Sequence, residues 1–231
     1  MLIFVQNHYD MAELDKYIYD EIVPRYSAFD SAHKEDHALT VISQAMELAD
    51  RMESWKAEQK EVEALWNVDI DRNILLAAAA CHDLGLVNGR DRHHLDSGEI
   101  IRADMNLRKW FTEEEIETIA QAAEDHRASG KSAPRTIYGM LVAEADRVID
   151  PNTIILRTVQ FGMDRYPELT HEEHVERAVA HLKEKYGRGG YLKLWIPWSD
   201  NAAQLSRLQE MIDEEQVIRT TVSLIHKRLA Q

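Results

Sequence analysis

Apolar residues recur at helical spacing along almost the whole 231-residue chain, and this spacing limits the folds that it can adopt. Only 9 Gly and 5 Pro interrupt the pattern, and alternating β-branched residues are scarce. Thr170 with Glu173 matches a capping box, as expected at a helix start. Residues 2–5 could form a short strand, but the chain offers it no partner. We predict an all-α fold, with helices at 10–22, 34–54, 70–83, 94–109, 113–126, 135–149, 152–165, 171–186 and 200–229.

The composition indicates an acidic protein with a sizeable core. It is 45% hydrophobic and 29% charged, with a formal net charge of −14. Nucleic acid and anionic membranes carry the same sign of charge, so both are disfavoured as partners. No apolar run is long enough to span a bilayer, residues 1–6 lack the features of a signal peptide, and the single cysteine cannot form an internal disulfide. We expect a cytoplasmic protein, and the oligomeric state stays open.

One short segment places two good metal ligands at the end of an apolar helix. The run from Ile74 to Cys81 is rich in helix formers, and it leads into His82 and Asp83 just before Gly85. A carboxylate beside a protein core needs a partner, because an unpaired buried charge is costly. A bound cation would satisfy both side chains.

Other candidate ligands also stand in apolar helical settings. His37 shares a helix face with Val41, and Asp146 lies in an otherwise apolar helix. With His82 and Asp83 they form a nitrogen and oxygen set without thiolate, which suits Mn, Fe, Mg, Co, Ni or Zn. The fold must bring these residues together, because they are far apart in the sequence.

Two more histidines lie between Asp83 and Asp146. His94 stands at a helix start and His126 at a helix end. If both face the first site, a second cation can bind roughly 3.5–4 Å from the first. His93 is an alternative to His94, since neighbours at a helix start point to different sides. His171 and His174 could bind a metal on a later helix, but their glutamate neighbours favour a solvated face.

Basic residues concentrate in one segment, 127–135, within a stretch that has no Asp or Glu from His126 to Ala143. Arg127, Lys131 and Arg135 fall here, and the segment ends at a predicted helix N-terminus, where free N–H groups favour anions. It is either a solvated loop or a phosphate clamp to which Tyr138, one turn on, would contribute. A second basic and aromatic stretch, 183–198, could cap a substrate, but packing onto the core is favoured.

The order His37, His82-Asp83, Asp146 resembles the signature of the HD superfamily of metal-dependent phosphohydrolases, and His94 and His126 resemble the extra ligands of its two-metal members. The resemblance covers about 33–150. It implies an HD helical bundle at 33–150, after an N-terminal helical segment at 1–32 and before a helical extension at 151–231 packed on the core. Many members have a lysine where this chain has Leu86, which leaves the substrate open.

The resemblance implies hydrolysis of a small-molecule phosphoester, such as a nucleotide or small phosphate ester, by a metal-activated hydroxide. His37, His82, Asp83 and Asp146 would hold one divalent metal ion. A second would be held by His94 and His126, with Asp83 as a bridge. Arg127 and Arg135 would neutralise charge in the transition state. The alternatives are a di-iron oxygenase of the same superfamily and a regulatory module that binds metal and nucleotide with little turnover.

Overall fold

The computed structural model describes residues 12–30, 33–127 and 132–230, and over these ranges the chain is helical without any strand. The all-α prediction is therefore confirmed, whereas the strand considered at 2–5 lies outside the described residues. None of the described helices is long and apolar enough to cross a bilayer. The chain divides into two compact units, Met1–Asp146 and Arg147–Gln231, each described by itself below.

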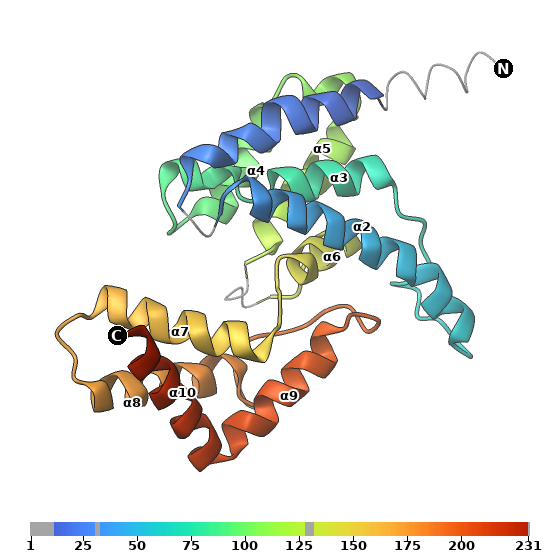
Figure 1. The fold of residues 1–231 in the computed structure, drawn as a ribbon. Coiled ribbons are helices and arrows are strands. Elements are labelled where there is room, and N and C mark those ends of the chain that lie inside the picture. The colour runs from blue at the N-terminus through green and yellow to red at the C-terminus, as the bar shows by residue number, and fades with distance from the viewer. Residues whose placement is uncertain (1–11, 31–32, 128–131, 231) are drawn as a thin grey trace. The chain divides into compact units, whose positions relative to one another are not determined.

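The first unit begins with a helical stretch at 12–17, and its further elements follow in chain order (Figure 1). They are η1 (Ile18–Ile22), η2 (Val23–Ala28), α2 (Glu35–Glu58), α3 (Arg72–Cys81), η3 (Leu84–Asn88), α4 (His93–Ala103), η4 (Leu107–Lys109), α5 (Glu113–Asp125) and α6 (Ile137–Ala145). The second unit contains α7 (Pro151–Arg165), α8 (His171–Tyr186), α9 (Asn201–Asp213) and α10 (Glu215–Leu229).

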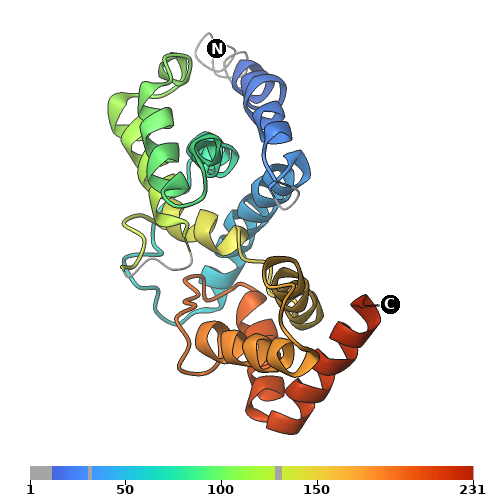
Figure 2. The ribbon, with the colours of Figure 1, turned by 90° about the vertical axis from the view of Figure 1, so that its left-hand side faces the viewer.

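Helix α3 forms the centre of the first unit. Asp71 caps its start by accepting hydrogen bonds from the N–H groups of Asn73 and Ile74, at 2.8 and 3.3 Å. Every residue from Ile74 to Cys81 is buried, and α2, α5 and α6 pack around the helix. Figure 2 looks along α3, in teal, between the blue helices of the early chain and the green pair α4 and α5. Its C-terminal end therefore delivers His82 and Asp83 into the interior.

The helix expected at 135–149 is reduced to Ile137–Ala145, and two other predicted helices are interrupted in the structure. The helix expected at 94–109 ends at Ala103, because the Asp104 carboxylate accepts hydrogen bonds from the N–H groups of Asn106 and Leu107 and starts a new turn. The helix expected at 200–229 breaks at Glu214, whose φ of −88° and ψ of 86° separate α9 from α10. No Gly or Pro marks that break, so helical spacing alone could not reveal it.

The aromatic stretch at 183–198 packs inside the second unit. Leu192, Ile196 and Trp198 are buried there, although the chain around them is irregular. Arg147 donates a hydrogen bond from Nη1 to the carbonyl of Lys193 at 2.9 Å, which fixes the start of the unit against this stretch. These contacts agree with a packing role for the aromatic residues.

Candidate metal centre

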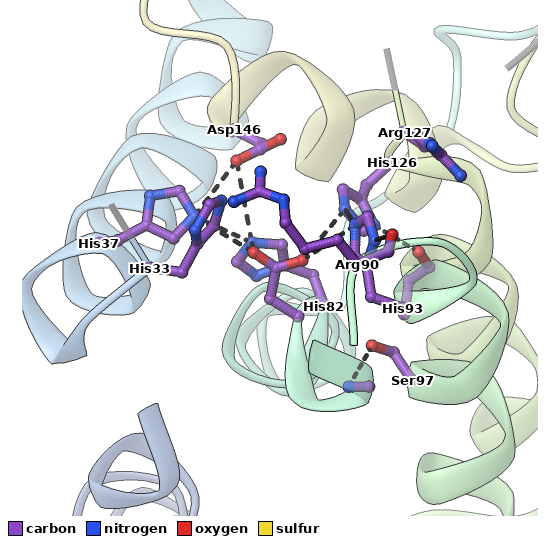
Figure 3. A network of polar contacts seen from close by, with 12 residues as sticks. His33, His37, His82, Arg90, His93, Ser97, His126, Arg127 and Asp146 are labelled. Atoms are coloured by element: carbon purple, nitrogen blue, oxygen red, sulfur yellow. Dashed lines mark hydrogen bonds and ion pairs between the residues drawn. The ribbon is translucent and has the colours of Figure 1, made fainter. Parts of the chain in front are cut away.

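Histidines and aspartates from five helices of the first unit converge on one place (Figure 3). Helix α2 supplies one of them, α4 supplies one at its first residue, and the others directly follow the last residues of α3, α5 and α6. In chain order they are His37, His82, Asp83, His93, His126 and Asp146.

The first group of ligand atoms centres on His37. Its Nε2 lies 3.3 Å from His82 Nε2, 3.6 Å from Asp83 Oδ2 and 3.3 Å from Asp146 Oδ1. His82 Nε2 in turn lies 3.4 Å from Asp83 Oδ2 and 3.8 Å from Asp146 Oδ1. Two histidine nitrogens and two carboxylate oxygens thus surround one point, as a hard or borderline divalent cation requires.

The second group lies on the other side of the Asp83 carboxylate. Asp83 Oδ1 is 3.4 Å from His93 Nε2 and 3.3 Å from His126 Nε2, and these two nitrogens are 3.3 Å apart. Because Oδ2 faces the first group and Oδ1 the second, Asp83 stands between them as a bridge. A carboxylate in this position can contact a cation on either side of it.

Backbone carbonyls set the orientation of three of these rings. His82, His93 and His126 each direct Nδ1 at the carbonyl of the residue three positions earlier. The distances to Ala79, Arg90 and Ala123 are 2.8, 2.7 and 2.5 Å. A carbonyl only accepts hydrogen bonds, so Nδ1 carries a proton and Nε2 is the nitrogen that faces the ligand groups.

This proton arrangement fits a bound cation. In the neutral rings, His93 Nε2 and His126 Nε2 would point lone pairs at each other across 3.3 Å and repel. Asp83 Oδ1, which faces both, is buried and has no hydrogen-bond partner within residues 12–30, 33–127 and 132–230. A divalent cation among these atoms would satisfy the lone pairs and the carboxylate together.

The helix backbone adds to the attraction for cations. His82, His126 and Asp146 are the C-cap residues of α3, α5 and α6. A helix C-terminus carries partial negative charge on its last carbonyls, which favours a cation nearby. The ends of these helices therefore support the side-chain ligands.

The carboxylates of the site are ionised in the metal-free protein, whereas His37 holds a proton that a cation would have to displace. Burial alone would raise the pKa of Asp83, but the surrounding histidines hold it well below its usual range. Likewise, burial would lower the pKa of His37, but Asp146 and Asp83 outweigh it and raise the pKa to about 9. Burial lowers the pKa of His93. The carboxylates are thus ionised at neutral pH and available as ligands.

Tyr26 and Ser97 support the site without any signal in the sequence, and both act on the turn that contains Gly85. The buried Tyr26 hydroxyl donates to the carbonyl of Ala80 at 2.8 Å and accepts from the N–H of Asp83 at 3.2 Å, which fixes the turn into the site. Gly85 donates its N–H to Ser97 Oγ at 2.8 Å. A Cβ at Gly85 would collide with the carbonyl oxygen of His93, so only glycine lets the turn approach α4 this closely.

The structure differs from the prediction at the start of α4, where His93 and not His94 joins the second group. The hydrogen bond from His93 Nδ1 to Arg90 turns that ring toward Asp83. Successive helical residues point about 100° apart, so His94 is directed elsewhere. Burial, with help from Arg127, lowers the pKa of His94 to about 4.

Among the described residues of the predicted phosphate clamp, Arg127 lies beside the ligand groups. Arg127 follows His126 directly, and its Nη1 donates to the carbonyl of Asp91 at 2.7 Å, in the loop before α4. It therefore lies beside the second ligand group. Lys131 lies outside the described residues.

Arg135 and Tyr138 do not join the ligand groups. Arg135 forms ion pairs with Glu124 and Asp125, at 2.6 and 2.9 Å, so its charge is already neutralised. The Tyr138 hydroxyl accepts a hydrogen bond from the N–H of Asp71 at 2.9 Å. Asp71 caps the start of α3, about 15 Å along this helix from the site at its other end. Neither residue is retained as a substrate contact.

Arg90 is a basic residue near the site that the sequence did not single out. Its Nη1 is 2.7 Å from Asp30 Oδ2, and the other oxygen of that carboxylate is 2.7 Å from His33 Nδ1. The His33 ring lies against the His37 ring, with centroids 5.3 Å apart. The exposed Arg90 side chain thus reaches the neighbourhood of the first ligand group, as Figure 3 shows.

Known proteins give one informative comparison. No curated protein and no solved structure matches the chain at a significant level. Residues 35–149 match the family model of the HD domain, and this segment contains every histidine and aspartate of the two ligand groups. Through this domain the chain belongs to the HD superfamily, whose members are generally metal-dependent phosphohydrolases.

Proposed function

We propose that the chain is a phosphohydrolase that uses two divalent cations to cleave a small-molecule phosphoester in the cytoplasm. The observation that carries the proposal is the Asp83 carboxylate, whose oxygens face two separate groups of histidine nitrogens. When bound, the cations would lower the pKa of water from about 15.7 toward 7 and so supply a hydroxide nucleophile near neutral pH.

The ligands of the two ions follow from the distances. His37, His82, Asp146 and Asp83 Oδ2 would hold the first ion. Asp83 Oδ1 with two further histidines, His93 and His126, would hold the second. Nitrogen and carboxylate ligands suit Mn, Fe, Mg, Co, Ni or Zn.

Arg90 and Arg127 are suited to bind the anionic substrate. Arg127 lies beside the second ligand group, and Arg90, near the first, would reach a phosphoester at the metals by exchanging its Asp30 partner for the substrate. A guanidinium can bind two phosphate oxygens at once and neutralise charge that develops as the ester bond breaks. Arg90 would thereby supply a positive charge that this chain lacks at Leu86.

The test is metal analysis of the purified protein, followed by a phosphoester panel with Mn, Mg, Co and Ni added back. We expect hydrolysis that depends on the metal and is lost in Asp83→Asn, a variant that excludes a contaminating phosphatase. Oxygen consumption by an iron-loaded protein would instead indicate the oxygenase. Tight nucleotide binding with negligible hydrolysis across the panel would indicate the regulatory module, and either result would overturn the proposal.

A further inference from the structure

The second unit contains a hollow of about 440 Å³ that the proposed function does not use. It lies along α8 and the loop that leads into this helix from α7. Its lining residues fall outside the segment that matches the HD domain. They are Tyr166, Leu169, Arg177, Ala180, His181 and Glu184.

Arg177 gives the hollow its positive charge. Arg177 Nη2 donates to the carbonyl of Thr158 at 2.6 Å, and Arg177 Nε is buried with no hydrogen-bond partner. Among the residues that the structure describes, no carboxylate lies within ion-pair distance of this guanidinium. Such an arginine is unexpected in a chain with 41 acidic and 27 basic residues.

The guanidinium is held in a fixed position at the wall of the hollow. Its Cζ lies 5.9 Å from the ring centroid of Phe161 and 5.7 Å from that of Tyr166. Its plane rests against Gly162, where a Cβ would collide with Nη2 and Nε. Because the ring contacts and the Thr158 carbonyl already order the side chain, a ligand that binds it loses little entropy.

The surroundings limit the charge that a ligand can carry. Burial, together with Lys185 and Arg177, lowers the pKa of His181, which is therefore neutral at pH 7. Arg177 then carries the full positive charge of the lining. The carboxylate of Glu184 repels a ligand that carries a second negative charge. Leu169, Ala180 and the Tyr166 ring offer apolar surface to the rest of a ligand.

We propose that this hollow binds a small carboxylate monoanion with an aromatic or branched apolar body, through Arg177 and the apolar wall. The site is independent of the metal centre, so its failure would leave the proposed hydrolase intact.

The experiment is calorimetric titration of the full chain with benzoate, benzamide and phenyl phosphate. We expect benzoate to bind with a Kd of roughly 1 mM, which is reasonable for a ligand of this size. Benzamide, which lacks the charge, should bind about tenfold more weakly or worse. Phenyl phosphate tests the charge limit, because its dianion should bind more weakly than benzoate.

Two variants test the hollow, one by removing its charge and one by filling its volume. Arg177→Met keeps much of the side-chain volume but removes the charge, and we expect it to weaken benzoate binding about tenfold or more. Ala180→Trp should fill the hollow without touching the Thr158 contact. Arg188→Met is the matched control, because Arg188 is exposed and paired with Asp213 at 2.6 Å.

If the wild type binds no benzoate at about 20 mM, a concentration well above the expected Kd, the proposed binding site is wrong. Arg177 then has a structural role only. Benzoate binding that survives in Ala180→Trp would overturn the site too, and this test stands even if Arg177→Met fails to fold. Tighter binding of phenyl phosphate than of benzoate would overturn the monoanion assignment.

Discussion

Both units bring buried histidines together, but only the first surrounds them with carboxylates. In the second unit, His171 and His174 of α8 meet His226 of α10. His174 is only 5% exposed, so the expectation of a solvated face was wrong for this residue. Over the residues that the structure describes, no carboxylate lies within ion-pair distance of these histidines, in contrast to Asp83 and Asp146 in the first unit.

The ring nitrogens are also used differently in the two places. His171 Nδ1 lies 3.0 Å from His226 Nδ1, and His171 Nε2 lies 2.9 Å from Ser223 Oγ. In the second unit, His171 thus bonds a ring nitrogen and a hydroxyl, whereas His174 Nδ1 is buried without a hydrogen-bond partner among the described residues. In the first unit, Nδ1 of His82, His93 and His126 is hydrogen-bonded to a backbone carbonyl. Nε2 of each ring is left to face a carboxylate. The comparison teaches that buried histidines form a metal site when their protons are placed elsewhere and a carboxylate completes the set.

The strongest test of this difference is Asp83→Ala. Asp83 contributes an oxygen to both ligand groups, so its loss should remove both cations and abolish phosphoester hydrolysis while leaving the helical content largely unchanged. Elemental analysis after gel filtration measures the metal content, and circular dichroism measures the helix.

His226→Ala provides the matched control, since it removes a buried histidine from the group without carboxylates. We expect its metal content to equal that of the wild type. Full metal occupancy in Asp83→Ala, or metal loss in His226→Ala, would contradict the distinction between the two histidine groups.

The next largest effect separates two adjacent histidines. His93→Ala should lose about one of the two bound ions, because His93 lies in the second group only. His94→Ala should keep both. Calorimetric titration of the metal-free variants with Mn²⁺ gives the number of ions bound. A wild type that binds a single ion at saturation would rule out the two-metal form, while the first site could survive.

Most of the ligands could be predicted from local sequence because each stands at a helix end or on an apolar helix face. His37, Asp83 and His126 are examples. The choice of His93 over His94 depends on the rotation of the helix start, which a single hydrogen bond to a carbonyl sets. Tyr26 could not be predicted, since its partners Ala80 and Asp83 are more than 50 residues away in the chain and no pattern links them.

A smaller effect is expected from Tyr26→Phe. This change removes the hydroxyl that joins the carbonyl of Ala80 to the N–H of Asp83, and leaves both backbone groups buried without it. We expect about 1–3 kcal/mol of lost stability in urea unfolding of the metal-free protein. We also expect roughly 10- to 100-fold weaker metal binding, as for other residues that position a ligand. Unchanged values for both would show that Tyr26 does not position Asp83.

The smallest effect concerns pH and the second unit. Burial, together with His171 and His174, lowers the pKa of His226, so the unfolded chain takes up a proton at a higher pH than the folded chain does. Stability should therefore fall as the pH drops below about 6.5 toward the lower folded pKa. His226→Gln lacks this contribution, so its unfolding free energy should change less steeply with pH than that of the wild type. The difference in slope corresponds to at most one proton taken up on unfolding, about 1.4 kcal/mol per pH unit.

Urea unfolding of the metal-free protein between pH 7 and pH 5 measures both slopes. Acid effects on the first unit are common to the two proteins and cancel in the comparison. Equal slopes would show that His226 does not titrate differently in the folded chain.

The helix ends at the metal centre have a consequence for the order of events in turnover. The C-termini of α3, α5 and α6 and the carboxylates of Asp83 and Asp146 offset the positive charge of the protonated His37, so the metal-free site gives an anion little attraction. A phosphoester should therefore not enter before the cations, which makes binding compulsorily ordered, with metal first and substrate second. Inorganic phosphate should accordingly bind the metal-loaded protein and not the chelator-treated one, and the fold itself would then prevent a substrate from occupying an enzyme that cannot cleave it.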